Sequence, residues 1–137
     1  MASRQNWPVL IVEDDPSMNH ALERILRIAG YDPIAFESGE ALIGDGRSAG
    51  AVCIVADVQL PGMSGFELHR RLLQEGRPAP FIFITAYDEP ETRLKAQEAG
   101  AVAYLTKPFA GHDLIEAVMQ AHGATPPSRG RRWRSAR

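Results

Sequence analysis

Four short runs of apolar residues recur along the chain, and each run is continuous rather than alternating with polar residues. Strands that are buried on both faces of a parallel sheet have this pattern, because neither face meets water. We therefore expect a largely parallel sheet. The four runs are residues 9–12, 52–56, 81–84 and 101–105, and a weaker fifth run is residues 34–36.

Helical patterns lie between these runs, and the first is the clearest. Apolar residues occur at helical spacing over residues 18–29. Asp15 is the expected N-cap, Pro16 lies in the first turn, and Gly30 is the expected stop. The pattern predicts an amphipathic helix with one face on the sheet.

Four further helices are expected, and two of them are weak. Residues 38–48 contain three glycines, each of which costs a helix about 1 kcal/mol relative to alanine. Residues 90–99 have few large apolar groups beyond Leu94, so we expect this helix to be lightly anchored and able to shift. Ser64 and Glu67 have the spacing of a capping box and open a helix that closes near Gly76. The last helix is indicated by Leu114, Ile115, Val118 and Met119.

The alternation of strands and helices through five rounds predicts an α/β fold of (βα)5 order. Such an order gives a doubly wound five-stranded parallel sheet, with right-handed crossovers that place helices on both faces in a three-layer sandwich. A chain of 137 residues is long enough for one domain with its own core. We expect that domain to occupy residues 1–122.

The charge is distributed unevenly along the chain. All 17 acidic residues and 10 of the 15 basic residues precede residue 123, so this part carries a net charge of −7, and five arginines after it give +5. Residues 123–137 are rich in arginine, proline and glycine and cannot build a core. We expect them to form a basic, disordered tail or linker.

Acidic residues follow two of the predicted strands. Because the carboxyl ends of parallel strands share one edge of a sheet, Glu13, Asp14 and Asp57 are expected to meet there. Three adjacent carboxylates repel one another unless a cation lies among them, and a cluster of hard oxygen ligands suits Mg²⁺ or Mn²⁺. The alternative is that acidic residues cap the next helix and stay solvated, which we favour for Asp15.

Three more polar residues occur at or beyond strand ends, and each has an ordinary interpretation when taken alone. Thr85 could end a strand, Lys107 could be a surface charge and Tyr104 could be a core aromatic residue. Pro108 could follow an ordinary trans peptide bond, because cis bonds are only about 5–6% of X-Pro bonds in folded proteins.

Together these fragments resemble the receiver domain of two-component response regulators. The resemblance covers residues 8–122 in order and spacing, and it implies a flavodoxin-like (CheY-like) fold. It rests on Ile11-Val12-Glu13-Asp14-Asp15, on Val55 to Gly65 with Leu60-Pro61-Gly62-Met63 inside it, on Ile84-Thr85-Ala86, and on Tyr104 to Phe109.

The resemblance implies roles at the acidic cluster. Asp57 would be the phosphoacceptor, which takes a phosphoryl group from a phosphohistidine on a sensor histidine kinase. Glu13, Asp14 and Asp57 would hold Mg²⁺ (or Mn²⁺), with the backbone carbonyl of Gln59 as a further ligand. Lys107 would pair with a phosphoryl oxygen.

The resemblance also implies a switch. The Thr85 hydroxyl would move to the phosphoryl group, and Tyr104 would rotate inward into the space that it vacates. The bond before Pro108 would be cis, which turns Lys107 inward. The face formed by the fourth helix, fifth strand and fifth helix would then change shape.

Partners follow from the same resemblance. They are a sensor histidine kinase, a downstream protein or attached output domain, and in some receivers a second, phosphorylated copy. Kinase specificity is expected around the first helix, at His20, Glu23, Arg24 and Arg27. The chain is either a stand-alone receiver or a receiver fragment of a longer DNA-binding transcriptional regulator. The second alternative is considered because parts of the sequence resemble receivers attached to helix-turn-helix domains. No enzymatic activity is expected beyond its own phosphorylation and dephosphorylation.

Parts of the sequence are also compatible with two other function classes. The five C-terminal arginines and Trp133 could form a nucleic-acid-binding module, although the acidic body would oppose approach. A Mg²⁺-dependent phosphatase would need a second acid and a substrate pocket or cap, for which no segment is long enough. The single cysteine, Cys53, and the lack of an apolar leader or a roughly 18-residue apolar stretch indicate a cytoplasmic protein with no membrane contact.

Overall fold

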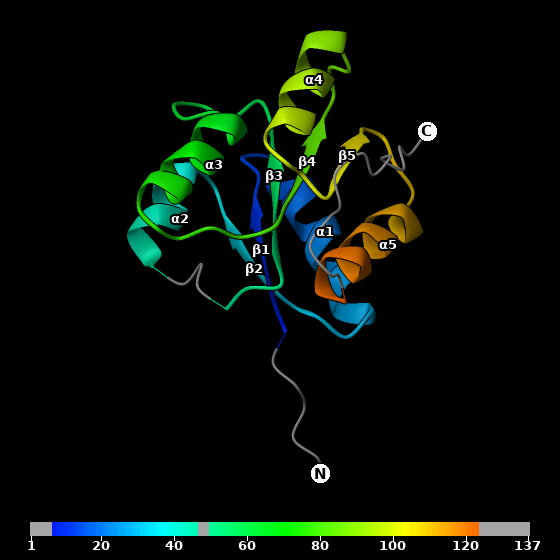
Figure 1. The fold of residues 1–137 in the computed structure, drawn as a ribbon. Coiled ribbons are helices and arrows are strands. Elements are labelled where there is room, and N and C mark those ends of the chain that lie inside the picture. The colour runs from blue at the N-terminus through cyan, green and yellow to red at the C-terminus, as the bar shows by residue number, and fades with distance from the viewer. Residues whose placement is uncertain (1–6, 47–49, 124–137) are drawn as a thin grey trace.

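Strands and helices alternate in the computed structural model, which describes residues 7–46 and 50–123 (Figure 1). The predicted tail beyond residue 123 lies outside the described residues. The strands are β1 (Pro8–Val12), β2 (Asp32–Phe36), β3 (Cys53–Asp57), β4 (Phe81–Thr85) and β5 (Ala103–Thr106). The helices are α1 (Pro16–Ile28), α2 (Gly39–Asp45), α3 (Gly65–Gln74), α4 (Pro90–Glu98) and α5 (Gly111–His122).

The five strands form one sheet in the order β2-β1-β3-β4-β5, and every neighbouring pair is parallel. The chain first moves outward from β1 to β2 and then returns to place β3 on the other side of β1. The carboxyl ends of β1 and β3 therefore lie side by side where the winding reverses, which is where ligands bind in open α/β sheets. This confirms the predicted (βα)5 parallel sheet.

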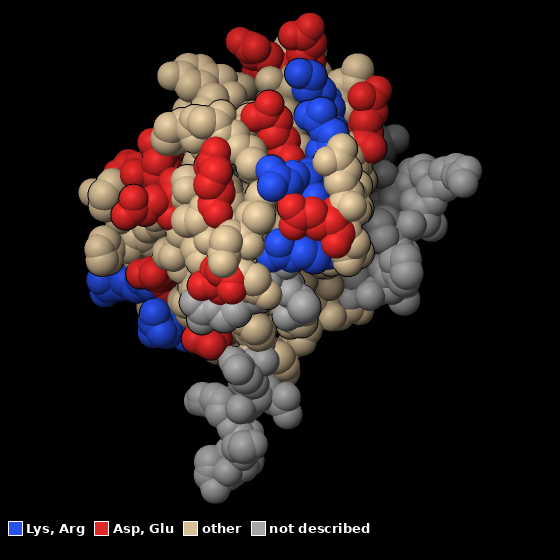
Figure 2. Space-filling model, turned by 90° about the vertical axis from the view of Figure 1, so that its left-hand side faces the viewer, with Lys and Arg blue, Asp and Glu red and all other residues tan. Residues whose placement is uncertain are grey.

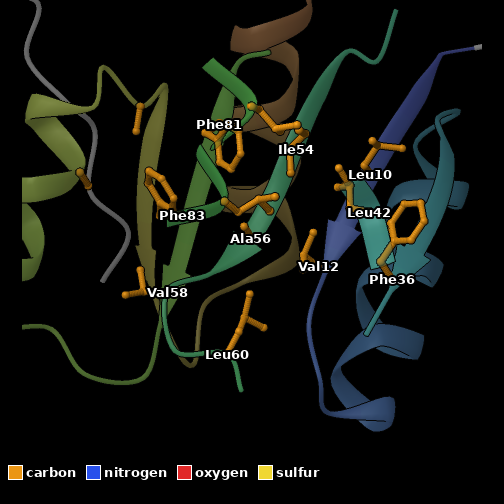
Figure 3. Close-up of a cluster of buried hydrophobic side chains, with 14 of the residues drawn as sticks. Leu10, Val12, Phe36, Leu42, Ile54, Ala56, Val58, Leu60, Phe81 and Phe83 are labelled. Atoms are coloured by element: carbon orange, nitrogen blue, oxygen red, sulfur yellow. The ribbon is translucent and has the colours of Figure 1, made fainter. Parts of the chain in front are cut away.

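Two apolar cores lie on opposite faces of the sheet, so the molecule has three layers. One core is formed with α2, α3 and α4, and the other with α1 and α5 (Figure 1). Figure 3 shows the first core, in which side chains from β1, β2, β3 and β4 gather on one face of the sheet with Leu42 of α2 among them. Both faces of the central strands are buried, which explains their continuous apolar sequence.

The helix starts follow the local sequence signals. Asp15 caps α1, where its Oδ1 accepts a hydrogen bond from the Ser17 N–H at 3.0 Å. At α3, the Ser64 hydroxyl accepts from the Glu67 N–H at 3.1 Å, and the Glu67 carboxylate accepts from the Ser64 N–H at 2.8 Å. This reciprocal pair is the predicted capping box.

Two apolar residues that mark helices in the sequence do not pack in the core. Leu94 does not anchor α4, because it is 52% exposed and, of the described residues of this helix, Ala96 alone is buried. Met119 of α5 is 58% exposed, and Ala117 takes part in the core beside Val118 instead. The short side chain of Ala96 gives α4 little apolar contact with the core, which agrees with the predicted light anchoring of this helix.

Acidic and basic side chains are interspersed on the side of the molecule that carries α2 and α3 (Figure 2). At the C-terminal end of α3, the Glu75 carboxylate accepts from Arg71 at 2.8 Å and from Arg77 at 2.9 Å. Exposed ion pairs of this kind contribute little to stability.

In the part of the chain that the structure describes, no helix has the length and apolarity to cross a membrane.

Candidate functional site

The acidic residues singled out in the sequence meet at the carboxyl edge of the sheet. Glu13 and Asp14 directly follow β1, and Asp57 is the last residue of β3. The Glu13 N–H donates to the Phe36 carbonyl at 3.1 Å, which continues the pairing of β1 with β2 and fixes the first acid. Ligand oxygens of Glu13, Asp14 and Asp57 all lie within 4.8 Å of one another.

Lys107 bridges the two buried acids of this cluster. Its Nζ donates to Asp57 Oδ2 at 2.6 Å and to Glu13 Oε1 at 3.0 Å. The backbone N–H of Lys107 donates to the Thr85 carbonyl at 2.8 Å, which ties the loop after β5 to the end of β4. The Lys107–Pro108 peptide bond is cis. One cation thus lies between the carboxylates of two different strands.

Burial and charge shift the pKa values of the bridged groups. Desolvation raises the pKa of Glu13, and the Asp57 charge adds to the rise, while hydrogen bonds from Lys107 and the Asp15 N–H partly offset it. Desolvation acts to lower the pKa of Lys107, but its hydrogen bonds to Asp57 and Glu13 outweigh that effect and raise the pKa. Lys107 is therefore cationic at neutral pH.

The composition of the cluster fits a divalent cation. Glu13 and Asp57 are 1% and 5% exposed, whereas Asp14 is open to solvent. A single lysine offsets only one of the two buried negative charges, and Asp14 adds a third. The donors are all carboxylate oxygens, which Mg²⁺ and Mn²⁺ prefer.

Thr85 lies beside the acidic cluster, and its hydroxyl is already engaged. The hydroxyl donates to the Gln59 side-chain Oε1 at 2.8 Å and accepts from the Tyr87 N–H at 3.0 Å. The backbone N–H of Gln59 in turn donates to Asp57 Oδ1 at 2.8 Å. Thr85 itself is fully buried.

Tyr104 is buried on β5 and 1% exposed. Its hydroxyl donates to Asp88 Oδ1 at 3.2 Å, and the guanidinium of Arg93 lies over its ring at 4.8 Å from the centroid. Arg93 also forms an ion pair with Asp88 at 2.8 Å. Desolvation, followed by the charge and hydrogen bond of Asp88, raises the pKa of Tyr104 to about 12.

The structure therefore brings Glu13, Asp14, Asp57 and Lys107 together, with Thr85 and Gln59 beside them. A carboxylate held next to a lysine and an oxygen-lined cation site can serve as a nucleophile toward a phosphoryl group. A family model described as the response regulator receiver domain matches residues 9–119. The chain belongs to this family. It is a receiver domain of two-component response regulators.

Several curated proteins are similar to this receiver. The response regulator protein TmoT of Ectopseudomonas mendocina is 34% identical over 122 residues, which are 89% of this chain and 56% of that protein. Nodulation protein W of Bradyrhizobium diazoefficiens is 36% identical over 113 residues, which are 82% of this chain and 50% of that protein. The chain thus spans about half the length of the curated relatives that it matches.

Solved receiver structures have the same fold. Response regulator StyR superimposes with a TM-score of 0.79 at 33% identity, covering 85% of this chain and 59% of that one. FixJ-N superimposes with a TM-score of 0.78 at 31% identity, covering 86% of this chain and 94% of that one. Chemotaxis protein CheY4 of Vibrio cholerae has a TM-score of 0.78 at 25% identity, covering 85% of this chain and 99% of that one. The predicted flavodoxin-like fold is confirmed.

Sequence reasoning missed three side chains that contact the receiver site. The sequence suggested only a backbone-carbonyl role for Gln59, yet its side chain bonds Thr85. Asp88 and Arg93 were not considered, although both contact Tyr104. Both residues lie just before or inside a weak helix, where charged residues are common. No signal in the sequence therefore distinguished them from ordinary surface residues.

Proposed function

We propose that Asp57 accepts a phosphoryl group from a phosphohistidine of a sensor histidine kinase. The observation that carries the proposal is the position of the Asp57 carboxylate, which is held between Lys107 Nζ at 2.6 Å and the Gln59 N–H at 2.8 Å beside two further acids. These donors orient the carboxylate, so its attack needs little further ordering.

The transfer forms one bond and breaks another. A carboxylate oxygen of Asp57 attacks the phosphorus, and the phosphorus–nitrogen bond of the phosphohistidine breaks. The imidazole leaves with the electron pair and takes up a proton. Lys107 Nζ, which already lies at Asp57 Oδ2, would remain close to the oxygens of the aspartyl phosphate and stabilise their charge.

Glu13, Asp14, Asp57 and the backbone carbonyl of Gln59 would hold Mg²⁺ (or Mn²⁺), which would neutralise charge on the phosphoryl oxygens. The Thr85 hydroxyl would then bond one of those oxygens. Because this requires the hydroxyl to turn away from Gln59, phosphorylation would reorganise the end of β4 and the lightly packed α4. The α4–β5–α5 face, with Tyr104 beneath it, is the surface that would report the change.

The experiment that tests this function is stoichiometric labelling. The protein is incubated with phosphoramidate, a small phosphodonor, and Mg²⁺, and its intact mass is measured. We expect one phosphoryl group per chain, lost in Asp57→Asn and retained in Asp32→Asn, which makes the same change at the opposite, amino end of β2. Label in Asp57→Asn, or sustained turnover of varied phosphate esters by the wild type, would contradict the proposal.

The partners belong to the same proposal. The exposed side chains of His20, Arg24 and Arg27 on α1 support a kinase-binding surface there, with the half-buried Glu23 between them. A cytoplasmic location fits a phosphoryl donor of that class. Exchange of these side chains should change which kinases phosphorylate the chain, and an unchanged kinase preference would contradict this surface.

A second possibility is that the chain is the receiver part of a longer DNA-binding regulator. Two relatives are named transcriptional regulatory proteins, FixJ at 28% identity and TdiR at 32% identity, and this chain covers 58% and 50% of their lengths. That difference in length leaves room for an output domain. Residues 1–122 would form the receiver domain and residues 123–137 the linker to that output. Sequencing the complete gene decides between the two arrangements.

A further inference from the structure

Gln59 contacts both the proposed phosphoacceptor and the threonine that would respond to it. Its backbone N–H donates to Asp57 Oδ1 at 2.8 Å, and its side-chain Oε1 accepts from the Thr85 hydroxyl at 2.8 Å. The backbone of Gln59 thus contacts Asp57, and its side chain contacts Thr85. Gln59 is therefore placed to couple the two strands from which Asp57 and Thr85 project.

The Thr85 hydroxyl has only one proton to donate. In the present arrangement that proton is directed at Gln59 Oε1, with the Tyr87 carbonyl as a longer acceptor at 3.3 Å. The hydroxyl oxygen already accepts the Tyr87 N–H at 3.0 Å. A hydrogen bond from Thr85 to a phosphoryl oxygen on Asp57 would therefore require the bond to Gln59 to break.

We propose that Gln59 is a positioning residue that holds the Thr85 hydroxyl away from Asp57 and so opposes the phosphorylated conformation. This inference rests on the proposed function of Asp57. When Asp57 carries a phosphoryl group, the Thr85 proton changes its acceptor from Gln59 Oε1 to a phosphoryl oxygen. The Gln59 amide is then released toward solvent.

The expected size of the effect follows from the exposure of the two partners. Thr85 is fully buried, but Gln59 is an exposed residue, so water competes for its amide oxygen once the bond breaks. A neutral hydrogen bond in such a setting contributes at the low end of the usual range. Removing it should tighten binding of a phosphoryl mimic by about 2-fold to 5-fold.

The first test replaces the acceptor and keeps the length of the side chain. In Gln59→Met, which retains the backbone N–H to Asp57, we expect beryllium trifluoride with Mg²⁺, a mimic of a phosphoryl group on a carboxylate, to bind about 2-fold to 5-fold more tightly than in the wild type. The affinity is measured by titration of amide signals. Gln74→Met makes the same change at an exposed position on α3 and should leave the affinity unchanged. Equal or weaker binding in Gln59→Met would overturn the inference.

A double-mutant cycle shows whether Thr85 carries the effect. Thr85→Val removes the hydroxyl and keeps the shape of the side chain, so Gln59→Met should no longer change mimic affinity in that background. A gain of the same size with and without the hydroxyl would mean that Gln59 acts by another route, and the inference would be overturned.

A readout without any mimic separates this inference from the proposed function. The side-chain rotamer of Thr85, measured from couplings of its methyl group in the ligand-free protein, should be more averaged in Gln59→Met than in the wild type, because the bond to Gln59 Oε1 is lost and the bond from the Tyr87 N–H remains. Failure of phosphoramidate to label wild-type Asp57 would refute the proposed function. An unchanged Thr85 rotamer in a Gln59→Met protein that still accepts the label would refute the role of Gln59 alone.

Discussion

The Tyr104 hydroxyl donates a hydrogen bond to Asp88 Oδ1 at 3.2 Å, and this contact links β5 to the loop before α4. Arg93, which pairs with the other oxygen of Asp88, lies over the ring of Tyr104. Tyr104 is thus buried while Thr85 still bonds Gln59. In this structure the ring of Tyr104 is therefore already inward, in contact with Asp88 and Arg93, while the Thr85 hydroxyl is bonded to Gln59.

Replacing Asp88 should therefore change the titration of Tyr104. In Asp88→Asn we expect the pKa of Tyr104 to fall below about 12, because the charge and hydrogen bond of Asp88 both raise it, and to stay above the ordinary value, because desolvation is the larger cause. The measurement is the pH titration of the Tyr104 ring carbon signals by NMR. Glu75→Gln breaks the ion pairs of α3 and is the matched control. An unaltered Tyr104 titration in Asp88→Asn would show that the contact is absent in solution.

Gly65 should not tolerate a side chain. A Cβ at this position would lie 2.5 Å from the backbone carbonyl oxygen of Asp57, so the start of α3 or the end of β3 would have to move. We expect Gly65→Ala to lower the free energy of unfolding by about 1–3 kcal/mol in urea denaturation. At Gly44 of α2 a Cβ meets no atom within 4 Å, and Gly44→Ala should raise stability by up to about 1 kcal/mol. Equal stability of the two variants would disprove the close approach.

The packing of α4 predicts a contrast between two leucines. Leu94→Ala should cost less than about 1 kcal/mol of unfolding free energy, because this side chain is 52% exposed. Leu72 of α3 is 1% exposed, so the same truncation there should cost about 2–5 kcal/mol. Both values come from urea denaturation. A large cost at Leu94 would mean that α4 packs more firmly than the structure shows.

His69 should make stability depend on pH. Burial against the rings of Phe81 and Phe83 lowers the pKa of His69, so the folded protein binds a proton less readily than the unfolded chain. The stability that depends on neutral His69 is therefore fully present above the pKa of the unfolded chain, about 6.5, and is lost as the pH falls through that pKa. His69→Gln should flatten the dependence between about pH 7.5 and pH 5 in urea denaturation. His20→Gln, at an exposed position on α1, is the control, and equal slopes for both variants would contradict the prediction.

Lys107 should be the stabilising cation of the site when no metal is bound. In Lys107→Met the Glu13 and Asp57 carboxylates stay close together without a neighbouring positive charge. We expect the free energy of unfolding, measured by thermal unfolding without divalent ions, to fall by on the order of 2 kcal/mol. Added Mg²⁺ should restore more stability to this variant than to the wild type, because it supplies the missing positive charge. Lys95→Met on α4, the other lysine of the chain, should show no such difference. An equal gain from Mg²⁺ in all three proteins would contradict this account.

Much of the fold could be predicted because its signals are local. Continuous apolar runs identified the buried strands, and Asp15 and Ser64 identified two helix starts that the structure confirms. Packing was less predictable. A leucine in a helical pattern is normally a core residue, yet Leu94 faces outward, since the face of α4 that meets the sheet is set by the loop on each side and places Ala96 there.

The apolar runs show which residues lie at strand ends, and therefore that Glu13, Asp14, Asp57 and Lys107 share one edge of the sheet. Order along the chain is sufficient for this, because all strands of a parallel sheet point the same way. Which atoms pair at that edge depends on how the strands and loops pack in three dimensions. Lys107 lies 94 and 50 positions from the acids that it bridges, and Gln59 lies 26 positions from Thr85. Such pairs depend on sheet register and loop shape to within an ångström, which no local pattern records.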